Sequence, residues 1–231
     1  MTGFRRLFFA ALLAGLAAGL ATSVVQAAKL WPMIASAELL EASAPPKPPP
    51  PGHAHDHGHD HDWSPEGLLR PALTVLFNIA AGVGFGLILN ALVRLRALAN
   101  DDGVSAREGV LWGIAGFAAF SLAPAMGLPP ELPGMAGGEL LNRQLWWAMT
   151  ALCTAGAIAL WVFRGGSWCA VAVILAVLPH LVGALHAHEH GAVPGEMGAA
   201  FAAASLAASA VFWVVLGGVS GWAQNRWSQP A

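Results

Sequence analysis

Long apolar runs separated by short polar or charged stretches dominate this sequence. A transmembrane helix needs about 20 mostly apolar residues, because the hydrocarbon core of a bilayer is about 30 Å thick. Six runs meet or approach that length: 7–28, about 71–93, 110–126, 144–163, 167–185 and 198–221. The pattern therefore predicts an all-α fold, a polytopic transmembrane helical bundle, built as a single membrane domain over residues 1–231.

Two of these runs leave alternatives open. The run at 110–126 is short and ends near Pro124, so five spans is the alternative to six. The first run follows Arg5 and Arg6 and contains Val25-Gln26-Ala27, which resembles a signal-peptide cleavage site. The apolar core of a signal peptide is only about 7–15 residues long. The first run is longer than that, which favours an uncleaved membrane anchor.

The positive charges predict how the bundle is oriented. Cytoplasmic loops of membrane proteins carry an excess of Lys and Arg. One side of a six-span bundle would hold Arg5, Arg6, Arg94, Arg96, Arg107, Arg164 and Arg226. The other side would hold Lys29, Lys47, Arg70 and Arg143 together with ten carboxylates. We therefore expect the arginine-rich side, with both termini, to be cytoplasmic.

Composition excludes several classes of function. Of the 231 residues 56% are hydrophobic and 10% are charged, whereas a soluble domain has about 25% charged residues. A soluble enzyme is thereby excluded, and a net charge of −2 leaves no basic field for nucleic acid. The two cysteines, Cys153 and Cys169, cannot alone form a disulfide framework or a zinc site. No phosphate loop, H-E-x-x-H or G-x-S-x-G motif occurs, so no enzyme is predicted.

Histidines gather on the predicted external side, chiefly in a Pro/His-rich loop at residues 42–66. Five imidazoles alternate there with aspartates and small residues: His53, His55, His57, His59 and His61. Neutral imidazole binds zinc, copper, nickel and cobalt, and the aspartates attract any cation. We interpret the loop as a flexible arm that collects metal, held out by a polyproline spacer. The alternative is a polar loop whose histidines bind metal only incidentally.

A second, shorter cluster follows the fifth run. It consists of His186, His188 and His190, with Glu189 or Glu196 available as an oxygen ligand. In a helix His186 and His190 share a face, and in an extended segment all three point the same way. Two or three imidazoles therefore converge, which is typical of a metal site. Because a histidine ligand must be neutral, capture is expected to weaken as the pH falls through about 6.5.

Two single residues add to these clusters. His180 follows Pro179 inside the fifth run, and an ionisable residue in an apolar span indicates a functional site. The alternative is that His180 hydrogen-bonds a carbonyl freed by Pro179 and ties two helices together. Glu131 lies in a stiff, proline-rich external loop at 127–134, where it can meet a cation. Taken alone, that pattern favours a carboxylate that caps a helix or pairs with Arg143.

Small and polar residues inside the runs predict helix contacts. Gly15 and Gly19 in the first run, and Gly82 and Gly86 within G-x-G-x-G in the second, have the small-xxx-small spacing of closely packed helices. Asn78 and Ser121 are among the few polar side chains in the runs. They can line a path, but in bilayers such residues usually form hydrogen bonds between helices.

Several segments in one order resemble the CbtA family, the proposed membrane subunit of a bacterial cobalt transporter. The most specific are LWGIAGFAAF at 111–120, GLPPELPG at 127–134, RQLWW at 143–147, LPHLVGA at 178–184 and VPGE at 193–196. The resemblance implies cobalt uptake linked to cobalamin synthesis, and a small single-span partner, CbtB, that carries its own histidines. It strengthens Glu131, His180 and Glu196 as candidates, because each lies in a matching segment.

These observations together predict a multi-pass protein of the bacterial inner membrane, embedded in the lipid bilayer, that captures divalent cobalt outside and passes it inward. The arm would concentrate metal, and His180 would be the first relay within the helices. His186, His188, His190, Glu196 and Glu131 would form the capture site. Cobalt is then a substrate and no cofactor is bound permanently; nickel and zinc use similar ligands and stay open. The alternative function is a membrane-bound metal-binding or scaffold protein that hands metal to another permease or chelatase.

Overall fold

The computed structural model describes residues 3–43, 67–100, 105–135, 137–184 and 193–228, and every regular element among them is helical. The helices are α1 (Gly3–Val25), α2 (Trp31–Ser43), α3 (Leu69–Asn100), α4 (Ala106–Phe117), α5 (Ala123–Ala125), α6 (Leu140–Phe163), α7 (Trp168–Val182) and α8 (Gly195–Ser228). Two π-helical turns, η1 (Gln26–Leu30) and η2 (Ala118–Leu122), continue α1 into α2 and α4 into α5. The all-α prediction is confirmed.

Five helical segments are long and apolar enough to cross a membrane. They are Gly3–Ser43, Leu69–Ala97, Ala106–Ala125, Leu140–Phe163 and Gly195–Trp227. The short run at 110–126 is among them because η2 and α5 extend α4 past Pro124. The run that falls short is the fifth: α7 has 15 residues, a rise of about 22 Å. It ends at Gly183, whose φ of 78° lies in the left-handed region.

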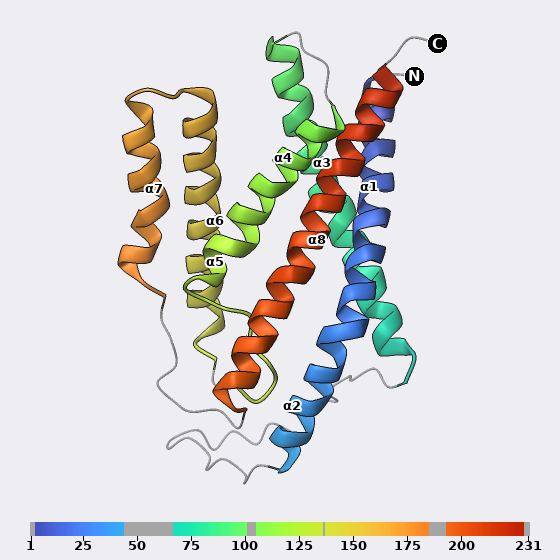
Figure 1. Cartoon of the computed structure of the whole chain (residues 1–231), viewed down its shortest axis with the longest axis vertical. Coiled ribbons are helices and arrows are strands. Elements are labelled where there is room, and N and C mark those ends of the chain that lie inside the picture. Colours follow the sequence, from blue (N-terminus) through green and yellow to red (C-terminus); the bar gives the residue numbers. More distant parts are fainter. Residues whose placement is uncertain (1–2, 44–66, 101–104, 136, 185–192, 229–231) are drawn as a thin grey trace.

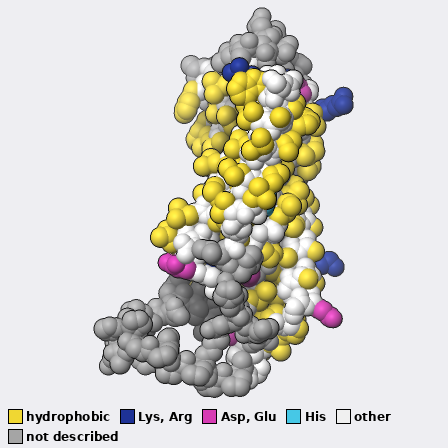
Figure 2. All heavy atoms as spheres, turned by 90° about the vertical axis from the view of Figure 1, so that its left-hand side faces the viewer, with side chains coloured by type: hydrophobic (Ala, Val, Ile, Leu, Met, Phe, Trp, Pro, Cys, Tyr) yellow, Lys and Arg dark blue, Asp and Glu magenta, His cyan; other side chains and the backbone are white. Residues whose placement is uncertain are grey.

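The helices form two groups of unequal size (Figure 1). α1 packs against α3 and α8, and α4 packs along α8. α6 and α7 pair with each other, and α6 meets the larger group chiefly at η2 and α5. On the face shown in Figure 2, hydrophobic side chains cover the middle and the charged side chains lie toward the two ends, as expected for a protein embedded in lipid.

Glycine lets α1 approach α3 closely. A Cβ on Gly15 would lie 2.4 Å from the backbone nitrogen of Val83, and one on Gly19 would lie 2.6 Å from the Cα of Ile79. A Cβ on Gly82 would meet the carbonyl oxygen of Gly15 at 2.6 Å. The predicted close packing is therefore confirmed for these residues. Gly84 differs, because a Cβ there would meet no atom within 4 Å.

A second glycine contact joins α4 to α8. A Cβ on Gly109 would lie 2.2 Å from the carbonyl oxygen of Gly217, and one on Gly113 would lie 2.2 Å from that of Trp213. Near the start of this pair, Ser105 caps α4 in a capping box with Glu108. The carboxylate of Glu108 also accepts a hydrogen bond from Arg96 at 3.0 Å, which ties the end of α3 to the start of α4.

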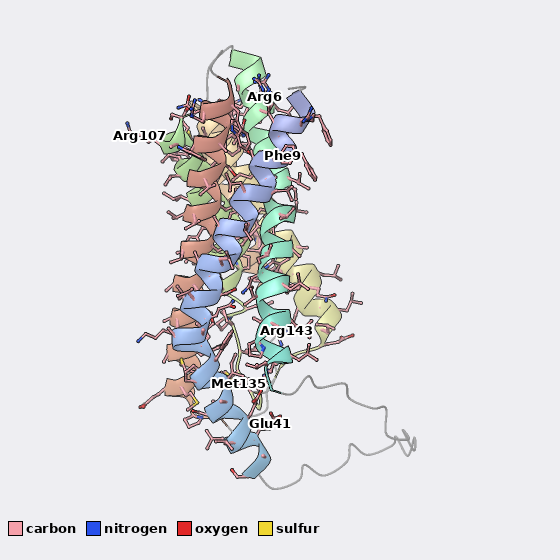
Figure 3. All side chains as sticks on the ribbon, turned by 90° about the vertical axis from the view of Figure 1, so that its right-hand side faces the viewer. Arg6, Phe9, Glu41, Arg107, Met135 and Arg143 are labelled. Carbon is pink, nitrogen blue, oxygen red and sulfur yellow. The ribbon has the colours of Figure 1, made fainter. Side chains whose placement is uncertain are left out.

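The charged residues labelled in Figure 3 lie toward the ends of the bundle to which the sequence assigns them. α1 begins and α8 ends at the same end (Figure 1), and Arg6 and Arg107 lie toward it, whereas Glu41 and Arg143 lie toward the other (Figure 3). We call these the arginine-rich end and the carboxylate-rich end. That the arginine-rich end faces the cytoplasm stays a prediction.

Candidate functional site

Three of the predicted metal ligands, Glu131, His180 and Glu196, lie among the described residues. The histidines of the two loop clusters lie outside the described residues: His53, His55, His57, His59, His61, His186, His188 and His190. Within the part of the chain that is described, no group of three or more His, Cys, Asp and Glu is placed to hold a metal ion. Glu131, His180 and Glu196 therefore do not form a metal site by themselves.

Glu131 forms an ion pair with Arg143. The glutamate oxygen Oε2 lies 2.7 Å from Nη2 of Arg143, and the two side chains are 23% and 27% exposed, respectively. The pair links the proline-rich loop to the start of α6. This is the arrangement that the loop pattern alone favoured for Glu131, and it leaves the carboxylate at the carboxylate-rich end, partly open to solvent.

The proline-rich loop is also packed against α2 and α8. Buried Leu132 belongs to a cluster with Leu30, Ala37 and Phe201, and Met135 packs against it. Figure 3 shows Met135 and Glu41 at the same end of the molecule.

Glu196 lies in the first turn of α8 and is exposed. A carboxylate there is favoured by the positive end of the helix dipole.

His180 lies near the end of α7, half-buried against α6. Its ring centroid is 5.8 Å from that of Trp146, in an edge-to-face arrangement. The indole N–H of Trp146 donates a 3.3 Å hydrogen bond to the carbonyl oxygen of Pro179. The hydrogen bond to the Pro179 carbonyl that links α6 and α7 therefore comes from Trp146. Whether His180 takes part in transport stays a prediction.

A pocket with a mainly apolar lining lies between α1, α3 and α8, and we call it the polar pocket after the six polar side chains that contribute to the lining. It has a volume of about 370 Å³, and Trp147 of α6 also lines it. Its polar lining consists of Thr22, Gln26, Asn78, Ser121, Ser205 and Ser209. No charged residue lines it, so its polar side-chain groups are neutral amides, hydroxyls and indoles.

Hydrogen bonds organise one wall of this pocket. The Nδ2 of Asn78 donates to Oε1 of Gln26 at 2.7 Å and to Oγ of Ser23 at 2.9 Å. On another wall the indole N–H of Trp213 donates to Oγ of Ser121 at 3.2 Å. Asn78 and Ser121 thus form the interhelical hydrogen bonds that we expected, and they line a pocket as well.

Both π-helical turns contribute to the pocket lining. Gln26 and Leu30 come from η1, and Phe120 and Ser121 come from η2. A π-helical turn widens the helix by one residue and is frequent at functional sites. Hydropathy gives no signal for such a turn. The polar residue Gln26 near the end of the first run was the only indication in the sequence.

A second, larger cleft opens at the carboxylate-rich end, between α2 and the start of α3. It has a volume of about 660 Å³, and its lining includes Trp31, Glu38, Gly67 and Thr74. Across it, Arg70 donates to both carboxylate oxygens of Glu38, at 3.1 and 2.5 Å. Gln26 and Leu30 line this cleft and the polar pocket alike. The two hollows therefore share part of one wall, at η1.

Aromatic rings close the polar pocket toward the arginine-rich end. The ring of Phe85 lies 5.0 Å from that of Trp213 and 5.5 Å from that of Phe120, measured between centroids. Beyond them lies a second polar cluster, in which Asn90 donates to Ser220 at 2.9 Å and accepts from Gln224 at 2.7 Å. Polar groups thus lie on both sides of an aromatic layer.

Comparison with models of known families matches residues 4–225 to CbtA, described as a probable cobalt transporter subunit. Comparison with curated proteins and with solved structures gives no match. The family match covers nearly the whole chain, and the helices are those of a multi-pass membrane protein. The chain therefore belongs to the CbtA family of probable cobalt transporter subunits.

Proposed function

We propose that this chain captures divalent cobalt at the carboxylate-rich end, on the outside of the bacterial inner membrane, and passes it inward between its helices. The observation that carries the proposal is that the two hollows share a wall at η1. The cleft beside Glu38 opens at the carboxylate-rich end, and Gln26 and Leu30, which line it, also line the polar pocket deeper in the bundle. Together with the family's substrate, this arrangement supports a route for a cation.

Capture begins with the histidine arm. Along the chain the arm lies between Ser43, the last residue of α2, and Gly67, which lines the cleft at the carboxylate-rich end. The tract from His53 to His61 concentrates metal there. His186, His188, His190, Glu196 and Glu131 form the capture site.

Glu131 takes part through its carboxylate, which is 23% exposed. A divalent cation that binds there takes the place of the Arg143 guanidinium, which lies 2.7 Å away. His180 then serves as the first relay, where α6 and α7 pack together at Trp146.

The family description as a subunit supports an assembly with a second chain. We propose that this partner is a small, single-span CbtB-type protein with its own histidines, and that the complex supplies cobalt for cobalamin synthesis. Both termini then lie in the cytoplasm, at the arginine-rich end. Nickel and zinc remain possible substrates, because both accept nitrogen and oxygen ligands.

Purified protein in liposomes tests the proposal. The chain is reconstituted alone and together with the small partner, and entry of Co²⁺ is followed with a metal-sensitive dye trapped inside. The proposal expects cobalt entry that protein-free liposomes lack. Metal binding without entry in both preparations would contradict it and favour the alternative, a protein that hands metal to another permease or chelatase.

A further inference from the structure

The imidazole of His180 is free of hydrogen bonds within the described part of the chain, and neither of its ring nitrogens is fully buried. A neutral imidazole binds metal through a ring nitrogen, so both nitrogens stay available. We propose that Trp146 is the positioning residue for His180: it orients the imidazole by ring packing and leaves the nitrogens free for the cation. The inference rests on the proposed function, in which His180 is the first relay.

Trp146 is itself held firmly. Its side chain is buried, and its indole N–H donates to the carbonyl oxygen of Pro179 at 3.3 Å. The same oxygen accepts a hydrogen bond from the backbone N–H of Gly183 at 3.0 Å, so the indole is attached to the last turn of α7. From the other side, a Cβ on Gly127 would lie 2.3 Å from Cη2 of the indole. The backbone of the proline-rich loop therefore lies directly against the ring.

The fixed indole in turn orients the imidazole. The two ring centroids are 5.8 Å apart and the ring planes meet at 71°, the edge-to-face geometry that aromatic pairs prefer. Because no hydrogen bond to the described residues fixes His180, this ring contact is what holds its side chain in place. A ligand that is already oriented loses less side-chain freedom when it binds. Trp146 therefore strengthens cobalt binding at His180 without touching the metal.

The position of Trp146 on α6 also relates the relay to the capture carboxylate. Trp146 follows Arg143 by three residues, which places the two side chains on one face of the helix, about 4.5 Å apart along its axis. Arg143 holds Glu131 of the proline-rich loop, and Gly127 of the same loop lies against Trp146. The loop thus contacts α6 at two points one turn apart. One of them binds the capture carboxylate, and the other supports the ring that orients the relay.

Cobalt entry into liposomes, measured over a range of Co²⁺ concentrations, tests this role. Trp146→Leu removes the ring and the N–H, whereas Trp146→Phe keeps a ring beside His180 and removes only the N–H. We expect the cobalt concentration for half-maximal entry to rise about tenfold in Trp146→Leu and about threefold in Trp146→Phe, with the maximal rate nearly unchanged, because a loosely held imidazole binds the entering cation more weakly. The control is Trp161→Leu, the same change at an exposed position of α6, which should behave as the wild type.

A substitution in the loop displaces the indole while leaving Trp146 and His180 in the chain. In Gly127→Ala the new Cβ would overlap the indole ring, so the half-maximal cobalt concentration should rise here too. Gly84→Ala, where a Cβ would meet no atom within 4 Å, is the control and should leave it unchanged. These measurements do not depend on whether Trp146→Leu folds.

A merely structural role for Trp146 predicts a different result. Fewer folded molecules would lower the maximal rate and leave the half-maximal cobalt concentration as it is in the wild type. That result in Trp146→Phe and Gly127→Ala, or wild-type behaviour in both, would overturn the inference while His180→Ala still abolishes entry and the proposed relay stands. If the wild type moves no cobalt, or if His180→Ala transports normally, the proposed relay fails and the inference fails with it.

Discussion

The contact between Gly15 and α3 allows a quantitative prediction. In Gly15→Ala the new Cβ would lie 2.4 Å from the nitrogen of Val83, 2.7 Å from its Cα and 2.6 Å from the carbonyl carbon of Gly82. Carbon atoms in contact are normally about 3.5–4.0 Å apart. All three atoms belong to the backbone, so no side chain can rotate away. The helices must separate by about 1 Å, which also loosens the contact of Gly19 with Ile79.

The magnitude follows from two opposing effects. Overpacking of a close contact costs about 1–3 kcal/mol, and the upper part of that range applies where backbone meets backbone. Alanine in place of glycine within a helix stabilises by about 0.5–1 kcal/mol. The net loss expected for Gly15→Ala is about 2 kcal/mol. For a chain of this length that lowers Tm by about 4–8 °C.

Gly84→Ala is the matched control, because it makes the same chemical change on α3 where a Cβ would meet no atom within 4 Å. It should melt at or slightly above the Tm of the wild type. Both variants are measured in one detergent by tryptophan fluorescence, for which the ten tryptophans provide the signal. The reasoning is refuted if Gly15→Ala melts as high as Gly84→Ala.

Two further predictions concern the cap of α4 and the loop histidines. Ser105→Ala removes the hydroxyl that accepts a hydrogen bond from the backbone N–H of Glu108. It should lower the free energy of unfolding by about 0.5–2 kcal/mol. The control Ser36→Ala, on the exposed face of α2, should leave Tm unchanged. Cobalt uptake at trace metal should fall as the pH is lowered from about 7.5 to about 5.5, because protonated imidazole cannot bind metal. Near pH 5.5 only about a tenth of ordinary imidazole groups are neutral. A variant in which the five arm histidines are asparagine should show a weaker pH dependence, and an unchanged profile would contradict a role for the arm.

Hydropathy predicted the helices well because a bilayer demands long apolar segments. Hydropathy did not predict the lengths of two helices, because backbone geometry decides where these helices end. α7 ends early at Gly183, whereas α4 continues through η2 and past Pro124 to 20 residues. Neither a left-handed glycine nor a π-helical turn changes the hydropathy of a run, so hydropathy does not predict that α7 is the short helix.

Glycine spacing predicted contacts but not partners. The spacing of Gly15 and Gly19 indicated a packed face, and α3 proved to be the helix that it packs against. Gly109 with Gly113, and Gly217 with Gly221, have the same spacing, which we did not single out. The structure pairs them as α4 and α8. Which helices meet depends on the whole bundle and cannot be read from one run.

The polar pocket was the least predictable feature. Asn78 and Ser121 attracted notice as isolated polar residues, and each forms the interhelical hydrogen bond expected of it. That they also face one pocket, with Thr22 and Ser205, depends on helices that lie far apart in the sequence. In the sequence Gln26 belongs to a cleavage-like motif. That it lines both the polar pocket and the cleft at the carboxylate-rich end depends on the fold.

The most direct test of the account is cobalt accumulation at trace cobalt in cells that lack other cobalt importers. Cells with this chain and the proposed small partner are compared with cells in which the chain carries His180→Ala, or Leu181→Ala as the control, because Leu181 is the exposed neighbour of His180. We expect accumulation with the wild type and the control, and its loss with His180→Ala at equal protein levels. No accumulation with the wild type would contradict uptake itself, and full accumulation with His180→Ala would contradict the relay.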